Sequence, residues 1–249
     1  MTHSTPLTII IPVLNEGEGF LALWSALETQ VQSKFNAFVV YDFDQDDTIP
    51  VVTEVVARGE NRLHLIKNSF GKGVVGAIRT GFEQVQDGPL LVVMGDLSDD
   101  LAKVDAMISI YQKGFHLVAA SRYMKGGAAI GGPWLKQTLS RLAGVSLYCL
   151  RGIPTHDATN AFKLYDSKML RTLRLESQGG FELNLEIAVK AFLAGYKIAE
   201  IPARWQERTH GKSKFRLWAW LPRYLKWYFY AFRPKDMRRS SIFGQVSHS

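Results

Sequence analysis

The stretch Leu7–Glu16 (LTIIIPVLNE) decides the fold of this 249-residue chain. Its nearly continuous apolar run, followed at once by a polar loop, is typical of a strand buried on both faces of a parallel sheet. Similar runs follow at Phe38–Tyr41, Leu63–Ile66 and Leu90–Met94, with helical patterns between them. This alternation predicts βαβ units and a mostly parallel sheet that is flanked by helices.

The second half of the chain is less regular. It contains a glycine-rich loop, Tyr123–Pro133 (YMKGGAAIGGP), which is long enough to form a lid over a site. Around this loop the sequence predicts two further strands and two helices, at Leu117–Ala120, Lys197–Pro202, Trp134–Leu150 and Glu182–Ala194. The single cysteine, Cys149, excludes a disulfide framework and fits a reducing compartment. We also find no signal-peptide pattern at the N-terminus.

Polar or acidic loops follow the first, second and fourth predicted strands, at residues 14–16, 42–48 and 95–100. Ligands of such sheets bind at the carboxyl ends of the strands. Three acidic loops at one edge would repel each other unless a cation or hydrogen-bond donors lay between them. A nucleotide offers such donors, and a divalent cation offers the charge. Each loop alone could be a solvated turn or a helix cap, but the three together indicate a binding site.

Seven short motifs occur in a fixed order along the chain: PVLNE (12–16), VVYDFDQDDT (39–48), GKG (71–73), GDLSDD (95–100), SRYMKGG (121–127), DATNAFKLY (157–165) and RTHGKSK (208–214). In this order they resemble the family 2 glycosyltransferases of the GT-A fold, and most closely the dolichyl- or polyprenyl-phosphate sugar transferases. The resemblance runs from Leu7 to about Leu217. It implies a mixed, mostly parallel α/β sheet and the transfer of a hexose from a nucleoside-diphosphate sugar.

The resemblance also assigns residues to the donor and to a metal ion. It places Mg²⁺ or Mn²⁺ on Asp96 and Ser98, at the position of the family's DxD motif. The first carboxylate of that motif is replaced by Met94, but one carboxylate, one hydroxyl and diphosphate oxygens can still hold such an ion. The donor-binding residues that it implies are Pro12, Leu14, Glu16, Val40, Asp42, Lys72, Gly95, Asp96, Arg208 and Lys214.

The expected chemistry requires positive charge around two phosphate groups. A cation on Asp96, together with Arg208 and Lys214, would neutralise the leaving diphosphate. Arg122 and Arg141 are candidates for binding the phosphate of the acceptor, with surface salt bridges as the alternative. We treat Asp96 as catalytic because it would hold this cation.

Asp157 is the second residue that we predict to be catalytic. A sugar hydroxyl as acceptor would need a general base, and Asp157 is the candidate for it. A phosphate monoester is largely ionised near neutral pH, so Asp157 would then orient other groups or act as a mild base. A simple capping role is the remaining alternative.

The net charge of +7 is unevenly distributed. From residue 202 onward, eleven Lys and Arg stand against two acidic residues, whereas the part before it has 19 against 21. A basic C-terminal segment of this kind is compatible with nucleic-acid binding or with an anionic membrane surface. The acidic loops at the sheet edge disfavour nucleic acid.

The segment Phe215–Phe232 (FRLWAWLPRYLKWYFYAF) favours the membrane surface. Its cations make a membrane span unfavourable. In a helix that starts at Pro222, the residues Arg223, Lys226 and Arg233 form one stripe, which predicts a helix lying in a bilayer interface. The alternative is a helix packed on the core. We therefore divide the chain into a catalytic domain, 1–214, and an interfacial segment, 215–249.

Two other functions remain open at this stage. Gly71, Gly73 and Gly76 form a G-x-G-x-x-G pattern after a strand, which taken alone indicates a dinucleotide-binding oxidoreductase. The reduced DxD motif would also suit a non-catalytic binding module. We favour inverting transfer of a hexose from GDP-mannose or UDP-glucose to a lipid-linked phosphate by a cytoplasmic protein that is peripheral on the inner face of a membrane. The oligomeric state stays open.

Overall fold

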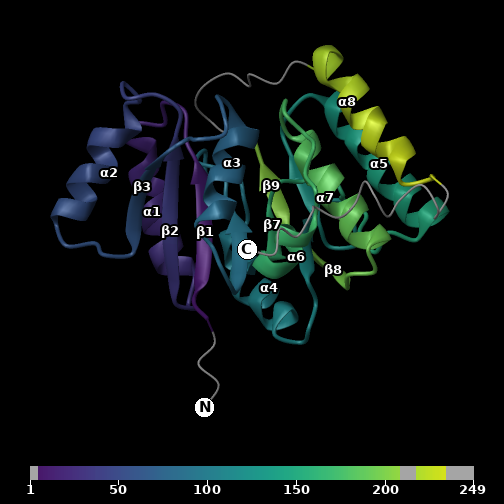
Figure 1. Ribbon diagram of the computed structural model, residues 1–249, viewed down its shortest axis with the longest axis horizontal. Helices are drawn as coiled ribbons and strands as arrows, with labels where there is room; N and C mark the ends of the chain where they lie inside the picture. Colours follow the sequence, from purple (N-terminus) through teal and green to yellow (C-terminus); the bar gives the residue numbers. More distant parts are fainter. Residues whose placement is uncertain (1–4, 208–216, 234–249) are drawn as a thin grey trace, which may run out of the picture.

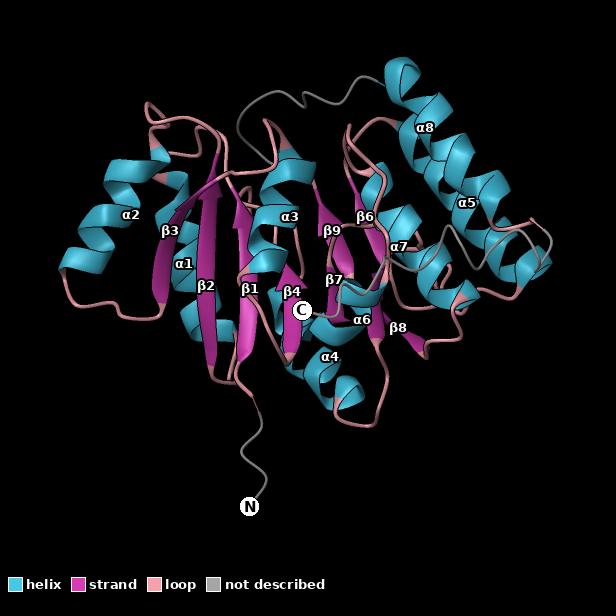
Figure 2. Ribbon diagram, viewed as in Figure 1, coloured by secondary structure: helices cyan, strands magenta, loops and turns pink. Residues whose placement is uncertain are grey.

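The computed structural model describes residues 5–207 and 217–233. Within these residues the central sheet has seven strands in the order β3-β2-β1-β4-β7-β5-β8 (Figure 2). In that order the strands span Leu63–Lys67, Phe35–Tyr41, Leu7–Pro12, Pro89–Val92, Lys163–Asp166, Leu117–Ser121 and Ile198–Pro202. Neighbouring strands of this sheet run parallel except β7, which is antiparallel to β4 and β5. The mixed, mostly parallel α/β sheet that we predicted is therefore confirmed.

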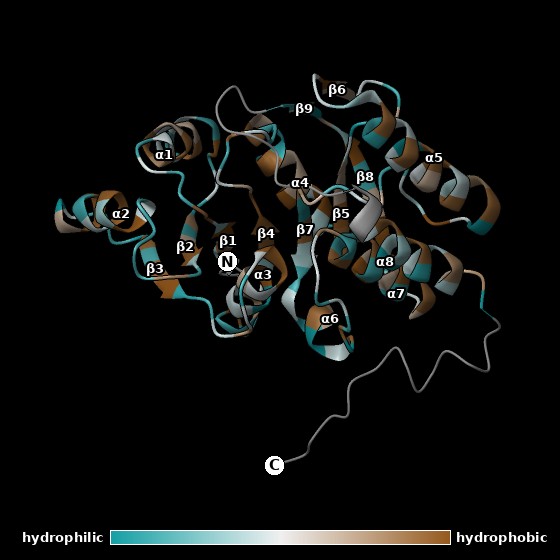
Figure 3. Ribbon diagram, turned by 90° about the horizontal axis from the view of Figure 1, so that it is seen from above, coloured by the Kyte–Doolittle hydropathy of each residue, from teal (hydrophilic) through white to brown (hydrophobic). Residues whose placement is uncertain are grey.

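Helices cover both faces of the sheet, as the view from above shows (Figure 3). The helices α1, α2 and α4 pack on one face and α3, α6, α7 and α8 on the other. Helix α5 lies beside α8 (Figure 1). The helices span Gly19–Gln30 (α1), Thr48–Ala57 (α2), Val74–Glu83 (α3), Val104–Tyr111 (α4), Trp134–Arg151 (α5), Ser167–Thr172 (α6), Glu182–Leu193 (α7) and Leu217–Tyr230 (α8), and a short 3₁₀ turn spans Leu101–Lys103.

Strand β1 shows why its sequence is apolar throughout. Successive side chains of a strand point to opposite faces of the sheet. Accordingly Ile9 and Ile11 enter the core beneath α1 and α4, whereas Ile10 enters the core beneath α3 and α7. All three isoleucines are fully buried. Two covered faces therefore require two sets of apolar residues in one strand.

The glycine-rich loop contains a short strand that the sequence did not predict. Residues Ala128–Ile130 (β6) pair in parallel with Arg204–Gln206 (β9). The backbone N–H of Ala128 also donates to the carbonyl O of Ala203 (3.1 Å). Three residues are too few for a periodic pattern, so this pairing is visible only in the structure. It fixes one half of the loop to the segment that follows β8.

Helix α8 differs from the helix that we expected to start at Pro222. It begins at Leu217 and has Pro222 inside it. The Trp220 ring lies so close to the Gly180 backbone that a Cβ at Gly180 would fall 1.5 Å from a ring carbon. This contact holds the extra turn, which helix propensity alone would not favour next to a proline.

One face of α8 packs on the domain, as in the alternative considered above. Trp227 and Ala231 are buried in the core, and the Trp227 indole N–H donates to Ser177 Oγ (3.0 Å). Lys226 was expected to face lipid headgroups, but its ammonium pairs with Glu176 (3.1 Å) and lies against the Trp227 ring. The Lys226 side chain is still 54% exposed, so its contact with lipid headgroups stays a prediction.

The opposite face of α8 is apolar and exposed. Leu225 and Phe229, one helical turn apart, are 41% and 63% exposed, and Phe232, in the turn just beyond α8, is 41% exposed. In the part of the chain that the structure describes, no helix combines the length and the hydropathy needed to cross a bilayer.

Candidate functional site

The loops after β1 and β4 meet at one edge of the sheet. Gly95, in the β4 loop, lies so close to β1 that a Cβ there would be 3.2 Å from the carbonyl O of Pro12 and 3.1 Å from Glu16 Cγ. A larger residue at 95 would push the two loops apart. The predicted donor residues Pro12, Glu16, Gly95 and Asp96 are thus brought together.

The loop after β2 braces the loop after β1. The backbone N–H groups of Asn15 and Glu16 donate to Asp46 Oδ2 (3.1 Å) and Thr48 Oγ1 (3.0 Å). Asp46 also accepts from the N–H of Thr48 (2.9 Å). Part of the acidic character of this loop therefore serves the turn, as the capping alternative predicted. Leu14, between these elements, is exposed at the edge.

Asp42 organises the glycine loop after β3. Its carboxylate accepts hydrogen bonds from Asn68 Nδ2 (2.6 Å) and from the backbone N–H of Gly73 (2.7 Å). Lys72 is exposed between its two glycines. Val40 was expected to contact the donor, but its side chain is fully buried in the core. Its carbonyl O already accepts from Val13 N–H (3.0 Å), so we withdraw Val40 as a donor contact.

In the DxD loop, the aspartates beyond Asp96 are engaged elsewhere. Asp99 accepts from the backbone N–H of Met94 (3.0 Å), and burial raises the pKa of its carboxyl to about 7. Asp100 accepts from the N–H of Arg204 (3.0 Å), on β9. Asp96 itself is half-buried and accepts from the N–H of Ser98 (3.3 Å).

These contacts allow a test of whether the loop fits a divalent cation. Asp96 and Ser98 offer one carboxylate and one hydroxyl at the sheet edge. Among the described residues, no group of three or more His, Cys, Asp or Glu side chains gathers as a metal cluster. The residues fit an ion that takes most of its ligands from water and from donor phosphates, as Mg²⁺ commonly does. They do not form a closed protein cage.

Arg122 and Asp157 form a buried ion pair. The Asp157 side chain is fully buried, and the Arg122 side chain is 11% exposed. The Asp157 carboxylate accepts from Arg122 Nε (2.7 Å), Nη2 (2.9 Å) and the backbone N–H (3.1 Å). This bidentate pair is a strong, directional contact. The geometry favours the orienting role of Asp157 over the general-base role, because its oxygens are enclosed and already bonded to Arg122.

Arg122 lines a cavity of about 640 Å³ between the glycine-rich loop and α5. Such a volume suits a ligand of ordinary size. Arg141 lines the same cavity from α5, together with Tyr123, Lys125 and Trp134. Among the hydrogen bonds between described residues, Arg122 uses its backbone N–H, Nε and Nη2, and none is made by Nη1. The cavity therefore presents guanidinium groups that are ready to bind an anion.

Lys163 holds the loop that follows Asp157 through hydrogen bonds to its backbone. It is fully buried in β7, and its ammonium donates to the carbonyl O of Ala158 (3.1 Å) and of Asn160. Burial lowers the pKa of Lys163 to about 7, although Asp157 works in the opposite direction. The lysine thus holds the loop that carries Asp157.

Sequence reasoning missed several residues of this site. Lys163 carries a signal, because a lysine in the apolar run AFKLY of a buried strand indicates a buried charge. Tyr123 stood inside a motif that we had quoted. Trp205 gave no signal, although its ring lies 6.0 Å from the Arg122 guanidinium. The predicted donor residues Arg208 and Lys214 lie outside the described residues.

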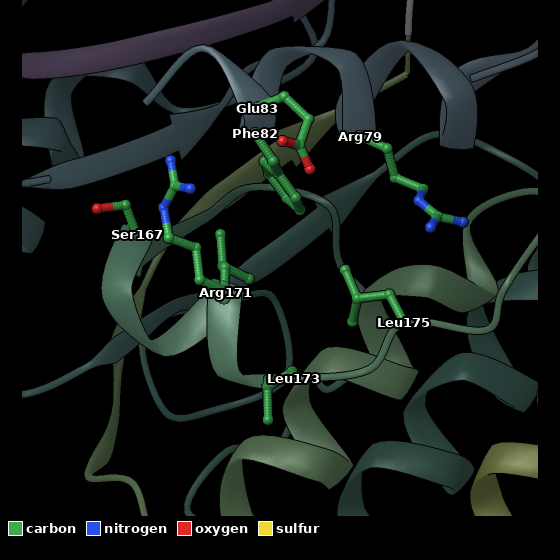
Figure 4. A pocket seen from close by; sticks show the side chains of 8 residues that line it. Arg79, Phe82, Glu83, Ser167, Arg171, Leu173 and Leu175 are labelled. Atoms are coloured by element: carbon green, nitrogen blue, oxygen red, sulfur yellow. The ribbon is translucent and has the colours of Figure 1, made fainter. Parts of the chain in front are cut away.

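A second, smaller cavity of about 140 Å³ lies between α3 and α6 (Figure 4). Arg79 and Glu83 on α3 and Ser167 and Arg171 on α6 line it, above leucines that include Leu173. None of the predicted site residues lines this cavity. It is therefore separate from the site at the sheet edge.

Comparison with solved structures supports the architecture. Glucosyl-3-phosphoglycerate synthase from Mycobacterium tuberculosis, solved with Mn²⁺, UDP and glucosyl-3-phosphoglycerate, superposes with a TM-score of 0.67. The match covers 91% of this chain and 79% of that chain at 14% identity, so the likeness concerns the fold. The mixed sheet and the loops that meet at its edge thus have the GT-A fold.

The family follows from the sequence match. Residues 8–174 match the model of glycosyl transferase family 2, and the chain belongs to this family. The chain is 26% identical over 211 residues to a polyprenol monophosphomannose synthase of Mycolicibacterium smegmatis, covering 83% of this chain and 79% of that protein. It is 24% identical over 231 residues to a dolichol-phosphate mannosyltransferase of Pyrococcus furiosus, covering 89% of this chain but 64% of that protein. The oxidoreductase alternative is therefore wrong.

Proposed function

We propose that the protein catalyses the inverting transfer of a hexose from a nucleoside-diphosphate sugar to a polyprenyl phosphate at a membrane surface. The observation that carries this proposal is the cavity with Arg122 and Arg141 beside the donor loops. Two guanidinium groups suit a phosphate monoester, and Arg122 is held in place by Asp157. The names of the two curated relatives, both of which include a polyprenol or dolichol acceptor, support the same substrate class.

The residues divide the work between donor and acceptor. Pro12, Glu16 and Asp42 border the edge where the nucleotide would lie, and Asp96 faces the diphosphate. A divalent cation held by Asp96 and Ser98 would offset the charge that develops on the leaving diphosphate. The structural relative was solved with Mn²⁺ and UDP, which supports a divalent cation in the reaction.

The acceptor needs little proton chemistry. A phosphate monoester is already largely ionised near neutral pH, so its oxygen can attack the anomeric carbon without a general base. Arg122 and Arg141 would hold that oxygen in line with the anomeric carbon. In this way they would accelerate the reaction chiefly by orienting the acceptor. Asp157 contributes by fixing Arg122.

The membrane surface is part of the proposal. The helices α5 and α8 pack side by side and carry exposed apolar side chains, including Leu150 and Phe229, and Phe232 follows in the turn after α8. Trp134, at the N-terminal end of α5, is 75% exposed and lines the cavity. A long polyprenyl chain could thus stay in the bilayer while its phosphate enters the cavity. We place the reaction at the inner face, which the exposed thiol of Cys149 supports.

Sugar transfer to farnesyl phosphate tests the proposal. The purified protein is incubated with Mn²⁺ or Mg²⁺ and with GDP-mannose or UDP-glucose, and formation of the glycosylated lipid is followed. We expect product with one of the two donors. Absence of product and of any nucleotide-dependent rise in Tm would instead support a non-catalytic binding module.

The Asp96→Ala variant tests the metal role in the same assay. We expect a loss of at least a hundredfold in turnover with an unchanged Tm in the absence of ligands, because Asp96 is half-buried at the edge and outside the core. Asp87→Ala is the matched control, since Asp87 is exposed and pairs with Lys168 away from the site. Full activity of Asp96→Ala would contradict the metal role.

A further inference from the structure

The hydroxyl of Tyr123 is a buried polar group without a partner. Within the described residues, its Oη is enclosed and makes no hydrogen bond. Ser140, the polar side chain beside it, is engaged with Thr159 (2.5 Å) and with Arg122 (3.2 Å). A buried hydroxyl left unsatisfied costs about 1–3 kcal/mol. Such a group in a folded protein calls for a reason, and a ligand is one.

Tyr123 lies where a ligand of defined chemistry would satisfy it. It lines the cavity that also contains Arg122 and Arg141, and its ring lies 4.9 Å from the Arg122 guanidinium. Burial raises the pKa of the Tyr123 hydroxyl above its ordinary value, although Arg122, the neighbouring Ser140 hydroxyl and Arg141 act in the opposite direction. The group therefore stays protonated at neutral pH. It can donate a hydrogen bond to an anion that the arginines attract.

The turn that carries Tyr123 is tightly closed. The N–H of Met124 donates to Ser121 Oγ (3.2 Å), and Gly127 lies so near the backbone that a Cβ there would be 2.3 Å from the carbonyl O of Ser121. The backbone that carries Tyr123 is thus held in place before any ligand arrives. Such preorganisation lowers the entropic cost of binding.

We propose that the Tyr123 hydroxyl donates a hydrogen bond to a phosphate oxygen of the acceptor and is a specificity-determining residue of this site. The inference deepens the proposed function and rests on it for the identity of the phosphate monoester. An oxygen that enters between Arg122 and Arg141 would complete the hydrogen bonding of Tyr123. An alcohol without a phosphate offers no such charged acceptor and would gain little from the hydroxyl.

The isosteric variant Tyr123→Phe separates this role from a structural one. We expect about a tenfold or greater loss of affinity for farnesyl phosphate, since a hydrogen bond to a charged group is lost. In the absence of ligand, Tm should be unchanged or higher, because an unsatisfied buried hydroxyl has been removed. The KM of the donor should not change. A structural hydroxyl would give the opposite pattern, with lower Tm and unchanged binding.

Tyr196→Phe is the matched control. The Tyr196 hydroxyl is bonded to Thr172 (2.8 Å) on the other side of the domain. Its removal should lower Tm and leave the binding of farnesyl phosphate intact. Tyr123→Phe should therefore weaken binding without lowering Tm, whereas Tyr196→Phe should lower Tm without weakening binding.

Three probes separate this inference from the proposed function: farnesyl phosphate, inorganic phosphate and farnesol, with binding measured by calorimetry. Equal affinity of wild type and Tyr123→Phe for farnesyl phosphate overturns the role of Tyr123 and leaves the function standing. A second outcome is that wild type binds both phosphates, Tyr123→Phe binds them more weakly, and wild type transfers no sugar. This outcome supports the role of Tyr123 in phosphate binding and overturns the proposed function. Absence of binding of either phosphate to wild type overturns both.

Discussion

At the scale of single residues, the ion pair Arg122–Asp157 determines how the cavity presents its charge. A guanidinium has five N–H donors in a fixed plane. Asp157 takes the Nε side of that plane and Ser140 accepts from Nη2, so Nη1 is the nitrogen left to meet a ligand. Charge and direction are therefore set by one buried carboxylate. An exposed arginine such as Arg141 keeps more freedom and would adjust to the ligand.

The Asp157→Asn variant distinguishes positioning from base catalysis. Loss of the carboxylate leaves Arg122 without its buried partner, and we expect a loss of about 3 kcal/mol in the free energy of unfolding. The KM for the acceptor should rise at least tenfold while the donor KM is unchanged. The pH profile of kcat should keep its shape. Disappearance of the acidic limb of that profile, where activity falls as a carboxylate is protonated, would instead identify Asp157 as the general base.

Asp105→Asn is the control for this change. Asp105 also accepts hydrogen bonds from backbone N–H groups, at Gln32 and Ser33 (both 2.9 Å), but lies on α4 away from the cavity. It should lose some stability without a change in either KM.

Lys163 predicts a pH dependence of stability. Its pKa of about 7 in the folded protein is below the ordinary value near 10.4. Between these values the unfolded chain binds more protons at this residue than the folded protein does, so its contribution makes stability rise with pH from about 7 to 10. In Lys163→Met this part of the slope should vanish. Urea unfolding at pH 7 and 9.5 measures it, with the exposed Lys168→Met as control. A slope that Lys163→Met leaves unaltered would contradict the lowered pKa of Lys163.

At the scale of elements, α5 carries the cavity because a glycine lets it approach the Asp157 loop. A Cβ on Gly144 would lie 2.0 Å from the carbonyl O of His156. No other residue fits this distance without movement of backbone. The contact joins α5, which bears Arg141, to the residue next to Asp157. The relative position of the two arginines thus depends on one glycine.

We expect Gly144→Ala to lower the free energy of unfolding by about 2 kcal/mol, because the helix must move away from His156. Acceptor binding should weaken as well, whereas donor binding should not. Gly19→Ala, at the start of α1, is the matched control, since a Cβ there meets nothing within 4 Å. It should be neutral or slightly stabilising. Equal stability of both variants would show that α5 is not constrained at this point.

Some strands of the sheet could be predicted from the sequence, and others could not. Strand β1 was predictable because three consecutive apolar residues, Ile9, Ile10 and Ile11, indicate a strand that is buried on both faces. The antiparallel direction of β7 was not, since no local pattern encodes the strand beside which it lies. Arg122 and Asp157 were both expected in the site, but they are 35 residues apart, and only the fold shows that they bond to each other.

At the scale of the whole molecule, acidic and basic residues are unevenly distributed along the chain. The part before residue 202 is slightly acidic and builds the sheet with its donor loops. The part after it is strongly basic and contributes α8, of which one face closes the core and the other is apolar and exposed. The sequence predicted this separation but not the two faces, because aromatic residues such as Trp227 and Phe229 look alike until the packing against α7 is known.

The exposed face of α8 makes the membrane proposal testable. Burial of a phenylalanine side chain away from water contributes about 1.5–3 kcal/mol. The double variant Phe229→Ser, Phe232→Ser should therefore bind vesicles of anionic lipid at least tenfold more weakly than wild type, with little change in Tm because both rings are exposed. Leu21→Ser, on exposed α1, is the control and should bind as wild type does. Raising the salt concentration should weaken binding of all three proteins, since the cations of the basic part act over a Debye length. Equal vesicle binding by the double variant and wild type would show that this face of α8 does not meet the bilayer.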